Sequence, residues 1–271
     1  MTHPPFRFGP ALLFCPADRP DRFEKAAERA DAVILDLEDA VAADGKHDAR
    51  LALVGASLDP ERVIVRLNPA SSDDFAHDLG AVAATDYRTV MLAKCEGTAD
   101  LVGLEDYEVI ALCETARGVL AAPEIAALPN VSALMWGAED LVVSLGGSSS
   151  RHPDGRYRDV AVHARSRVLL AAGAHRIAAI DTVHLDIADL PGLQDAAEDA
   201  AAMGFAATAC IHPSQVPVVR DAFRPSAERL EWARAVLAEA STRPGVFAFR
   251  GAMVDAPLLR QAEAVVRRAG G

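Results

Sequence analysis

The stretch AVILDLED, residues 32–39, followed by DGKHDARLALVGA, residues 44–56, contains the unit from which most of the chain is built. Its first part is a continuous apolar run that ends in carboxylates, which is typical of a strand buried on both faces in a parallel sheet. Its second part has apolar residues at helical spacing with charged residues between them, which is typical of a helix that covers such a sheet. Together they predict a strand followed by a helix.

Similar apolar runs recur along the chain, and Ala-rich helical patterns lie between most of them. The runs are ALLFCPA (11–17), AVILDLED (32–39), RVIVRLN (62–68), TVMLAKC (89–95), EVIALCET (108–115), SALMWGAED (132–140), HRIAAIDT (175–182) and AATACIHP (206–213). Eight strand–helix units in a chain of 271 residues predict a closed (β/α)8 barrel, the TIM-barrel fold. An open doubly wound sheet is the alternative, but no G-x-G-x-x-G motif follows the first run.

The chain continues for about 45 residues beyond the eighth run. Pro225 and Ser226 open a helical stretch, PGVFAFRGAMVDAP (244–257) predicts a hairpin, and LLRQAEAVVRRA (258–269) predicts a last helix. We therefore expect a barrel, the catalytic domain, over residues 1–224 and a C-terminal helical and hairpin extension over residues 225–271. Such an extension is too short for an independent core, so it should pack on the barrel or on a neighbouring subunit.

Composition narrows the possible partners and location. The net charge of −12 argues against nucleic acid and anionic membranes as non-specific partners. No apolar run is long enough to span a bilayer, and the N-terminus lacks the pattern of a signal peptide, so we expect a cytoplasmic protein. The four cysteines lie in apolar runs without C-x-x-C spacing, so we expect small core residues rather than zinc ligands.

Polar residues gather at the carboxyl ends of the apolar runs, the end at which barrel active sites are built. They are Asp18, Asp36, Glu38, Asp39, Arg66, Asn68, Lys94, Glu114, Glu139, Asp140, Asp181 and His212. Any single one of them is explained as a helix cap or a loop charge. Their recurrence at successive strand ends favours an active site.

Glu114 and Asp140 follow adjacent predicted strands and form the best candidate for a metal site. Two carboxylates suit a hard cation such as Mg²⁺, which keeps its other positions for water and substrate. The alternative is that Glu114 pairs with Arg117 and that Asp140 caps the next helix. Glu139 is expected to point away from the metal, because side chains alternate along a strand.

Two basic residues, Arg66 and Lys94, also lie at the carboxyl ends of apolar runs. Arg66 can bind a substrate carboxylate through a bidentate fork, or it can simply pair with Asp36 or Glu38. Lys94 can form a Schiff base, as in many barrel aldolases, but two metal-ligand candidates make a metal-assisted route sufficient.

The motifs AVILDLEDAVAADGKHDAR, VRLN, ALCETARGV, MWGAEDLVVSLGG and GAMVDAP occur in this order over nearly the whole chain. They resemble the citrate lyase β-subunit and its relatives in the HpcH/HpaI aldolase superfamily. The resemblance implies a (β/α)8 barrel that uses Mg²⁺ to split a carbon–carbon bond in 3-hydroxy acyl thioesters. One departure is LAKC around Lys94, where relatives commonly have LPK.

The resemblance also implies roles for single residues. Glu114 and Asp140 match metal ligands, and Arg66 matches the arginine that binds the substrate acid. Asp255 in GAMVDAP matches an aspartate that completes the site of a neighbouring subunit. The resemblance implies that such enzymes are homotrimers or hexamers. Without the resemblance, the sequence around Asp255 indicates an ordinary turn residue.

For catalysis we expect Asp255, or failing that Glu38 or Asp36, to move protons. Backbone N–H groups near Gly137 and Ala138 should stabilise oxyanion charge together with Arg66. A basic cluster is a candidate for coenzyme A phosphates, although it can equally be a solvated helix face. It consists of Arg19, Arg22 and Lys25.

The expected reaction is therefore cleavage of a 3-hydroxy acyl-CoA, such as citramalyl-, malyl- or citryl-CoA, into acetyl-CoA and a ketoacid. Two alternatives stay open. One is a citrate lyase β-subunit that acts only within a complex on a citryl thioester of an acyl carrier. The other is a class II pyruvate aldolase that acts on free hydroxy-ketoacids.

Overall fold

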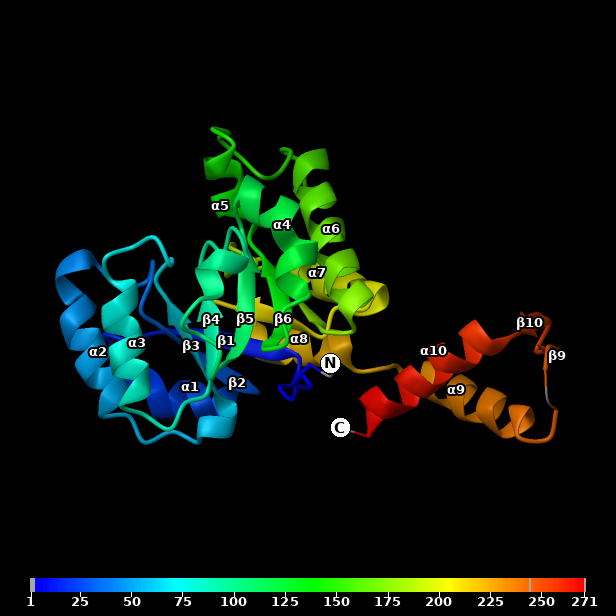
Figure 1. Ribbon diagram of the computed structural model, residues 1–271. Helices are drawn as coiled ribbons and strands as arrows, with labels where there is room; N and C mark the ends of the chain where they lie inside the picture. Colours follow the sequence, from blue (N-terminus) through cyan, green and yellow to red (C-terminus); the bar gives the residue numbers. More distant parts are fainter. Residues whose placement is uncertain (1–2, 244, 271) are drawn as a thin grey trace. The chain divides into compact units, whose positions relative to one another are not determined.

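The computed structural model describes residues 3–243 and 245–270. Eight parallel strands close into a barrel in which each strand pairs with the next in sequence and β8 pairs with β1 (Figure 1). The strands are β1 (Ala11–Pro16), β2 (Ala32–Asp36), β3 (Val63–Leu67), β4 (Thr89–Leu92), β5 (Glu108–Cys113), β6 (Val131–Trp136), β7 (Ala178–Asp181) and β8 (Ala207–Cys210). The (β/α)8 fold expected from the sequence is confirmed.

Helices follow most strands and cover the outside of the barrel (Figure 1). They are α1 (Phe23–Arg29), α2 (Lys46–Val54), α3 (Phe75–Ala83), α4 (Ala116–Ala126), α5 (Ala138–Ser144), α6 (Asp159–His175), α7 (Leu190–Met203) and α8 (Gln215–Phe223). β4 is followed instead by the 3-10 turn η4 (Thr98–Leu101); the other 3-10 turns are η1 (Pro20–Arg22), η2 (Ala43–Gly45) and η3 (Pro60–Arg62). α7 ends at Met203, and its C-cap Gly204 has a φ of 107°, a left-handed conformation that favours glycine.

Every residue of β2, β3 and β6 is buried, as expected for strands with helices on one side and the barrel interior on the other. The interior is filled by aliphatic side chains from the strands, so it is a packed core rather than a pore. These side chains include Leu12, Ile34, Ile64, Met91, Ile110, Leu112, Met135 and Ile180. The core fixes where the strand ends lie and therefore where the polar residues meet.

The sixth run ends earlier than its apolar pattern predicts. β6 stops at Trp136, and Ala138 already belongs to α5. Glu139 and Asp140 therefore lie in the first turn of a helix, and the argument from strand alternation that separated them was wrong. In a helix, neighbouring side chains diverge by about 100° because a turn contains 3.6 residues.

The chain divides into two compact units, Met1–Val219 and Arg220–Gly271. The second contains α9 (Ala227–Ala240), a hairpin of β9 (Phe247–Phe249) and β10 (Ala252–Val254), and α10 (Ala256–Ala269). Pro244, at the start of the predicted hairpin segment, lies outside the described residues.

Within this second unit, α9, the hairpin and α10 bury a small apolar cluster. It consists of Ala233, Val236, Val254, Ala262 and Val265. Partly buried aromatic and aliphatic side chains pack against the cluster. The packing of this extension on the barrel or on a second subunit stays a prediction.

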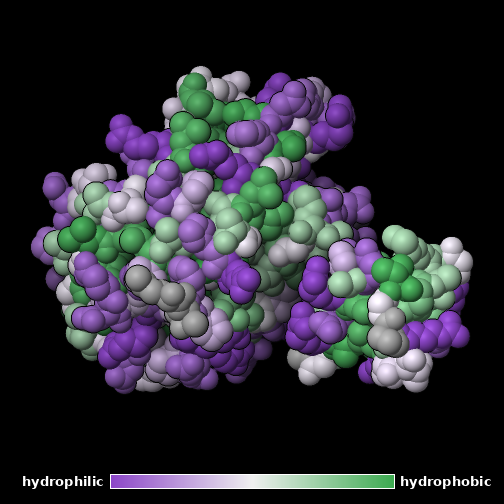
Figure 2. Space-filling model, turned by 45° about the vertical axis from the view of Figure 1, so that its right-hand side comes forward, coloured by the Kyte–Doolittle hydropathy of each residue, from purple (hydrophilic) through white to green (hydrophobic). Residues whose placement is uncertain are grey.

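Among the described residues, no helix is both long and apolar enough to cross a bilayer. Figure 2 shows that the visible face of the barrel unit is a mosaic of hydrophilic and hydrophobic residues.

Candidate active site

A cavity of about 320 Å³ lies at the carboxyl ends of the strands. Polar lining residues come from β2, β3 and the segments after β2, β5, β6 and β7, and apolar residues complete the wall. The residues that line it include Asp36, Asp39, Arg66, Glu114, Gly137, Ala138, Glu139, Asp140, Phe14, Leu112, Met135, Thr182 and Ile211. The fold therefore brings together in one cavity half of the twelve polar side chains that the sequence singled out.

Arg66 lies near the end of β3 and is only 9% exposed. Its Nε and Nη2 donate to the two carboxylate oxygens of Asp36 at 2.7 and 2.6 Å. Nη1 lies 3.1 Å from an oxygen of Glu38. The structural alternative, pairing with Asp36 or Glu38, is thus realised with both carboxylates. Arg66 also lines the cavity, and its five N–H groups exceed the two that donate to Asp36.

Asp36 is tied down from several sides. Besides the arginine fork, its oxygens accept from the backbone N–H of Glu38 at 2.9 Å and of Ala40 at 3.2 Å. Asp36 is 1% exposed, and its geometry suits orientation of Arg66. Glu38 is different, because burial raises its pKa above the ordinary value against the opposing charges of Arg66 and Lys94.

Glu114 follows β5 directly, and Thr115 then caps α4 by accepting from the Gly118 N–H at 3.0 Å. Glu114 is 3% exposed. Burial, and after it the negative charge of Asp140, raise the pKa of Glu114 to about 8. Gly137 makes this position possible, because a Cβ at residue 137 would lie 2.6 Å from Glu114 Oε2.

Asp140 occupies the first turn of α5, where a negative charge is favourable. The helix begins after Gly137, so Asp140 is not its N-cap, and Arg117 contacts Glu96 at 3.8 Å instead of Glu114. The structure therefore shows neither the pairing of Glu114 with Arg117 nor an N-cap role for Asp140. Glu139 lines the same cavity while its Oε1 accepts from Ser150 Oγ at 2.5 Å.

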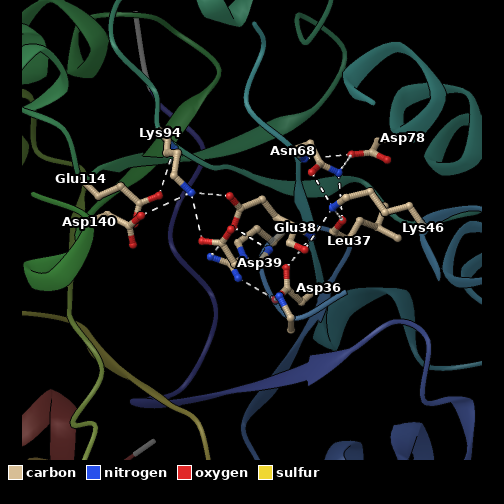
Figure 3. A network of polar contacts seen from close by, with 12 residues as sticks. Asp36, Leu37, Glu38, Asp39, Lys46, Asn68, Asp78, Lys94, Glu114 and Asp140 are labelled. Carbon is tan, nitrogen blue, oxygen red and sulfur yellow. Dashed lines mark hydrogen bonds and ion pairs between the residues drawn. The ribbon is translucent and has the colours of Figure 1, made fainter. Parts of the chain in front are cut away.

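Lys94 lies between two groups of carboxylates, Glu38 with Asp39 and Glu114 with Asp140 (Figure 3). Its ammonium contacts Glu38, Asp39 Oδ2 at 3.0 Å and Asp140 Oδ1 at 3.4 Å. Burial lowers the pKa of Lys94, but hydrogen bonds and charges, above all those of Glu38, outweigh it and keep the pKa above its ordinary value. A stably protonated amine is a poor nucleophile, so the geometry disfavours the Schiff-base alternative.

The donor set fits a magnesium ion. Within residues 3–243 and 245–270, no group of three His, Cys, Asp or Glu side chains is arranged as a metal cage. Mg²⁺ is usually held by one or two carboxylates and keeps waters and substrate atoms as its other ligands. Burial and the neighbouring negative charge of Asp140 raise the pKa of Glu114 even though the positive charges of Arg66 and Lys94 lower it. A divalent cation between Glu114 and Asp140 would favour the ionised carboxylate. Glu114 and Asp140 are the residues that would hold the ion.

Other polar residues at the strand ends are occupied by the scaffold. Asn68 donates from its side chain to Leu37 O and to Asp78, and it accepts from Lys46 (Figure 3). Asp181 accepts from Trp136 Nε1 at 2.5 Å and from Arg165 at 2.6 Å. These residues join neighbouring strands and helices.

His212 is also held locally, because its Nδ1 lies 2.7 Å from Ser214 Oγ within the same loop.

The basic cluster on the first strand–helix connection is exposed. Arg19, Arg22 and Lys25 lie on η1 and α1, and Arg19 pairs with Asp21 at 3.0 Å. Within the second unit, Asp255 caps α10 by accepting from the Leu258 N–H at 3.1 Å. The roles of these four residues toward substrate stay predictions.

A larger cavity, about 840 Å³, lies beside α6 and α7. It shares Glu139 and Thr182 with the smaller one, but Arg66, Glu114 and Asp140 line only the smaller cavity. Chemistry, rather than volume, therefore selects the candidate site.

Sequence reasoning missed Phe14 altogether and, for Gly137, missed its steric role. Phe14 lies in β1 with the Arg66 guanidinium 4.8 Å from its ring centre, a cation–π contact. Gly137 gives Glu114 its space. The glycine directly after an apolar run was the available signal, whereas nothing in the sequence pairs Phe14 with Arg66.

Comparison with known proteins gives a consistent result. The sequence profile of the HpcH/HpaI aldolase/citrate lyase family matches residues 10–213. A citrate lyase subunit beta-like protein of Mycobacterium tuberculosis is 59% identical over 262 residues, which cover 97% of this chain and 96% of that protein. Mitochondrial citramalyl-CoA lyase of Homo sapiens is 30% identical over 94% of this chain and 84% of its own length.

A solved structure extends the likeness to the fold. Protein CitE of Mycobacterium tuberculosis, in complex with magnesium, acetoacetate and coenzyme A, superimposes with a TM-score of 0.94 at 59% identity, covering 97% of this chain and 99% of that one. The expectation of magnesium as cofactor is confirmed by this homologous structure. The relatives also show that the protein is of the lyase kind.

Proposed function

The chain belongs to the HpcH/HpaI aldolase/citrate lyase family, and we propose that it is a magnesium-dependent lyase for a 3-hydroxy acyl-CoA thioester. Substrates of the citramalyl-, malyl- or citryl-CoA type would be split into acetyl-CoA and a ketoacid. The observation that carries the proposal is the buried Glu114, whose pKa is raised by burial and by the like charge of Asp140, in one cavity with Asp140 and Arg66.

The reaction removes the proton of the 3-hydroxyl group, whose oxygen becomes the carbonyl oxygen of the ketoacid. The electron pair of the breaking carbon–carbon bond passes to the thioester as an enolate, which takes up a proton to give acetyl-CoA. When bound at Glu114 and Asp140, Mg²⁺ supplies Lewis-acid stabilisation of the hydroxyl and the adjacent carboxylate.

The chain's own residues bind and orient the substrate. Arg66 is held rigidly by Asp36 and Glu38, so its remaining N–H donors are preorganised for a substrate carboxylate or a developing oxyanion. Backbone N–H groups at Gly137 and Ala138, which line the cavity, assist at the same oxygen. Coenzyme A phosphates bind at the exposed Arg19, Arg22 and Lys25.

Proton transfer needs a carboxylate that can exchange protons. Glu38 is the candidate within the barrel, because burial raises its pKa. Asp36 is engaged with Arg66 and acts as its positioning residue. Asp255 of a neighbouring copy is the candidate for the acid that protonates the enolate, in a homotrimer or hexamer.

The test is a panel of citramalyl-, malyl- and citryl-CoA with the corresponding free acids, assayed with Mg²⁺ or with EDTA. We expect thioester cleavage that requires Mg²⁺ and that is lost in Glu114→Ala and Asp140→Ala. Full metal-dependent turnover in either variant would remove the proposal. Cleavage of free hydroxy-ketoacids alone would instead identify a class II aldolase.

A second candidate is a β-subunit that acts within a citrate lyase complex, which the name of the 59% identical relative favours. Protein that binds Mg²⁺ and oxaloacetate yet cleaves only a citryl thioester of an acyl carrier protein would identify it.

A further inference from the structure

The turn after β4 holds Lys94 in an uncommon backbone conformation. Its φ is 48°, in the left-handed region that residues with a Cβ disfavour. The turn is clamped on both sides, because the Cys95 N–H donates to Leu112 O at 3.0 Å and the Cys95 carbonyl fits against Gly118. A Cβ at residue 118 would lie 2.3 Å from that carbonyl oxygen. Strain kept by such tight surroundings is often found at functional sites.

The strained turn aims the main chain of Lys94 at the metal-binding pair. Its backbone N–H donates to Glu114 Oε1 at 3.1 Å. On the opposite side, Gly137 admits Oε2 of the same carboxylate. Glu114 is thus fixed between residues 94 and 137, independently of the side chain at position 94.

The side chain of Lys94 takes the other member of the pair. Its ammonium lies 3.4 Å from Asp140 Oδ1 and also contacts Glu38 and Asp39 (Figure 3). Arg66 forms its ion pairs with Asp36 and Glu38. In the described part of the chain, Asp140 forms its ion pair with Lys94. The Lys94 side chain is 28% exposed, so it is not locked in a fully buried position.

We propose that Lys94 is a positioning residue whose ammonium occupies the cation position at Asp140 in the metal-free protein and leaves Asp140 when Mg²⁺ binds. After this exchange it stays with Glu38 and Asp39. The inference rests on the proposed function, because it takes Glu114 and Asp140 as the metal ligands.

This arrangement makes Lys94 an internal competitor of Mg²⁺. The ammonium compensates Asp140 before the metal arrives and repels the divalent ion afterwards, since like charges at such short range are unfavourable. Removing the positive charge should therefore strengthen Mg²⁺ binding. A purely structural role predicts the reverse, because a disordered site would bind the metal more weakly.

The experiment measures Mg²⁺ affinity by isothermal titration calorimetry on the full chain, without substrate. We expect Lys94→Met to bind Mg²⁺ about tenfold more tightly than the wild type, which corresponds to about 1.4 kcal/mol. Lys94→Arg, which keeps the charge, should stay within about threefold of the wild type. Lys94→Asn repeats the neutralisation with a residue that tolerates left-handed backbone, so a folding defect of the Met variant does not prevent the test.

The matched control is Arg117→Met, which removes one positive charge from an exposed side chain on α4 that pairs with Glu96. Its Mg²⁺ affinity should stay within twofold of the wild type. Unchanged or weaker binding in both neutral Lys94 variants would overturn the proposal while leaving the proposed function intact. Absence of Mg²⁺ binding in the wild type would overturn both.

Discussion

Gly137→Ala should damage the metal site through a single added methyl group. In the structure, a Cβ at residue 137 would lie 2.6 Å from Glu114 Oε2 and 2.8 Å from Glu114 Cβ. Ordinary contacts begin near 3.4 Å, so the carboxylate has to move by about 0.8 Å. Because the clash includes the Cβ of Glu114, a simple rotation of the carboxylate does not relieve it.

The backbone itself permits alanine. Gly137 has φ −125° and ψ 125°, an extended conformation that any residue adopts. The effect is therefore steric, and overpacking of this kind costs about 1–3 kcal/mol of folding free energy. A displacement of nearly 1 Å at a buried ligand should in addition weaken Mg²⁺ binding by at least about tenfold, or about 1.4 kcal/mol.

The assay combines thermal unfolding with calorimetric titration of Mg²⁺, and Gly173→Ala in α6 is the control. A Cβ at residue 173 meets nothing within 4 Å, so this helical substitution should leave Mg²⁺ affinity unchanged. A Gly137→Ala protein that binds Mg²⁺ as well as the wild type would show that Glu114 is not a ligand or that its position does not matter.

Three further outcomes are expected. Mg²⁺ at a hundredfold excess over its dissociation constant should raise the unfolding free energy of the wild type by about 2.7 kcal/mol and that of Asp140→Ala much less, as urea titrations with and without the ion would show. Asp36→Asn should lower the unfolding free energy by about 3 kcal/mol, because it breaks the buried two-bond contact with Arg66. Urea unfolding measures this change. The control is Asp199→Asn, at an exposed partner of Arg165, which should lower the unfolding free energy by less than about 1 kcal/mol. Burial raises the pKa of Cys15 from 9.0 to about 11, so its neutral thiol favours the folded state below pH 9, and this contribution is lost as the pH rises towards 11. In Cys15→Ala the fall in unfolding free energy between pH 9 and 11 should be smaller than in the wild type. An equal fall in both proteins would contradict the raised pKa of Cys15.

The fold and the members of the site could be predicted from the sequence to different depths. All eight apolar runs became strands of the barrel, because a strand buried on both faces shows its environment in its own composition. The polar residues after them were found because parallel strands bring their carboxyl ends to one side of the barrel. Glu114 and Asp140 were paired on that ground, and they do influence each other in the structure.

The partners of those residues could not be predicted in the same way. The apolar pattern of MWGAED continued a strand through residues that belong to a helix, because short apolar runs do not distinguish the two. Likewise, nothing in the sequence near Lys94 indicates that its ammonium lies 3.4 Å from Asp140, or that its backbone donates to Glu114.

The amino-acid sequence by itself determined the barrel and the set of side chains that reach its mouth, because apolar periodicity and strand ends are local properties of the chain. Only the tertiary structure decided that Arg66 is bound to Asp36, that Gly137 leaves room for Glu114, and that Lys94 joins two groups of carboxylates. Those contacts require segments far apart in the chain to be placed to within a few tenths of an ångström, and only the folded barrel fixes their positions.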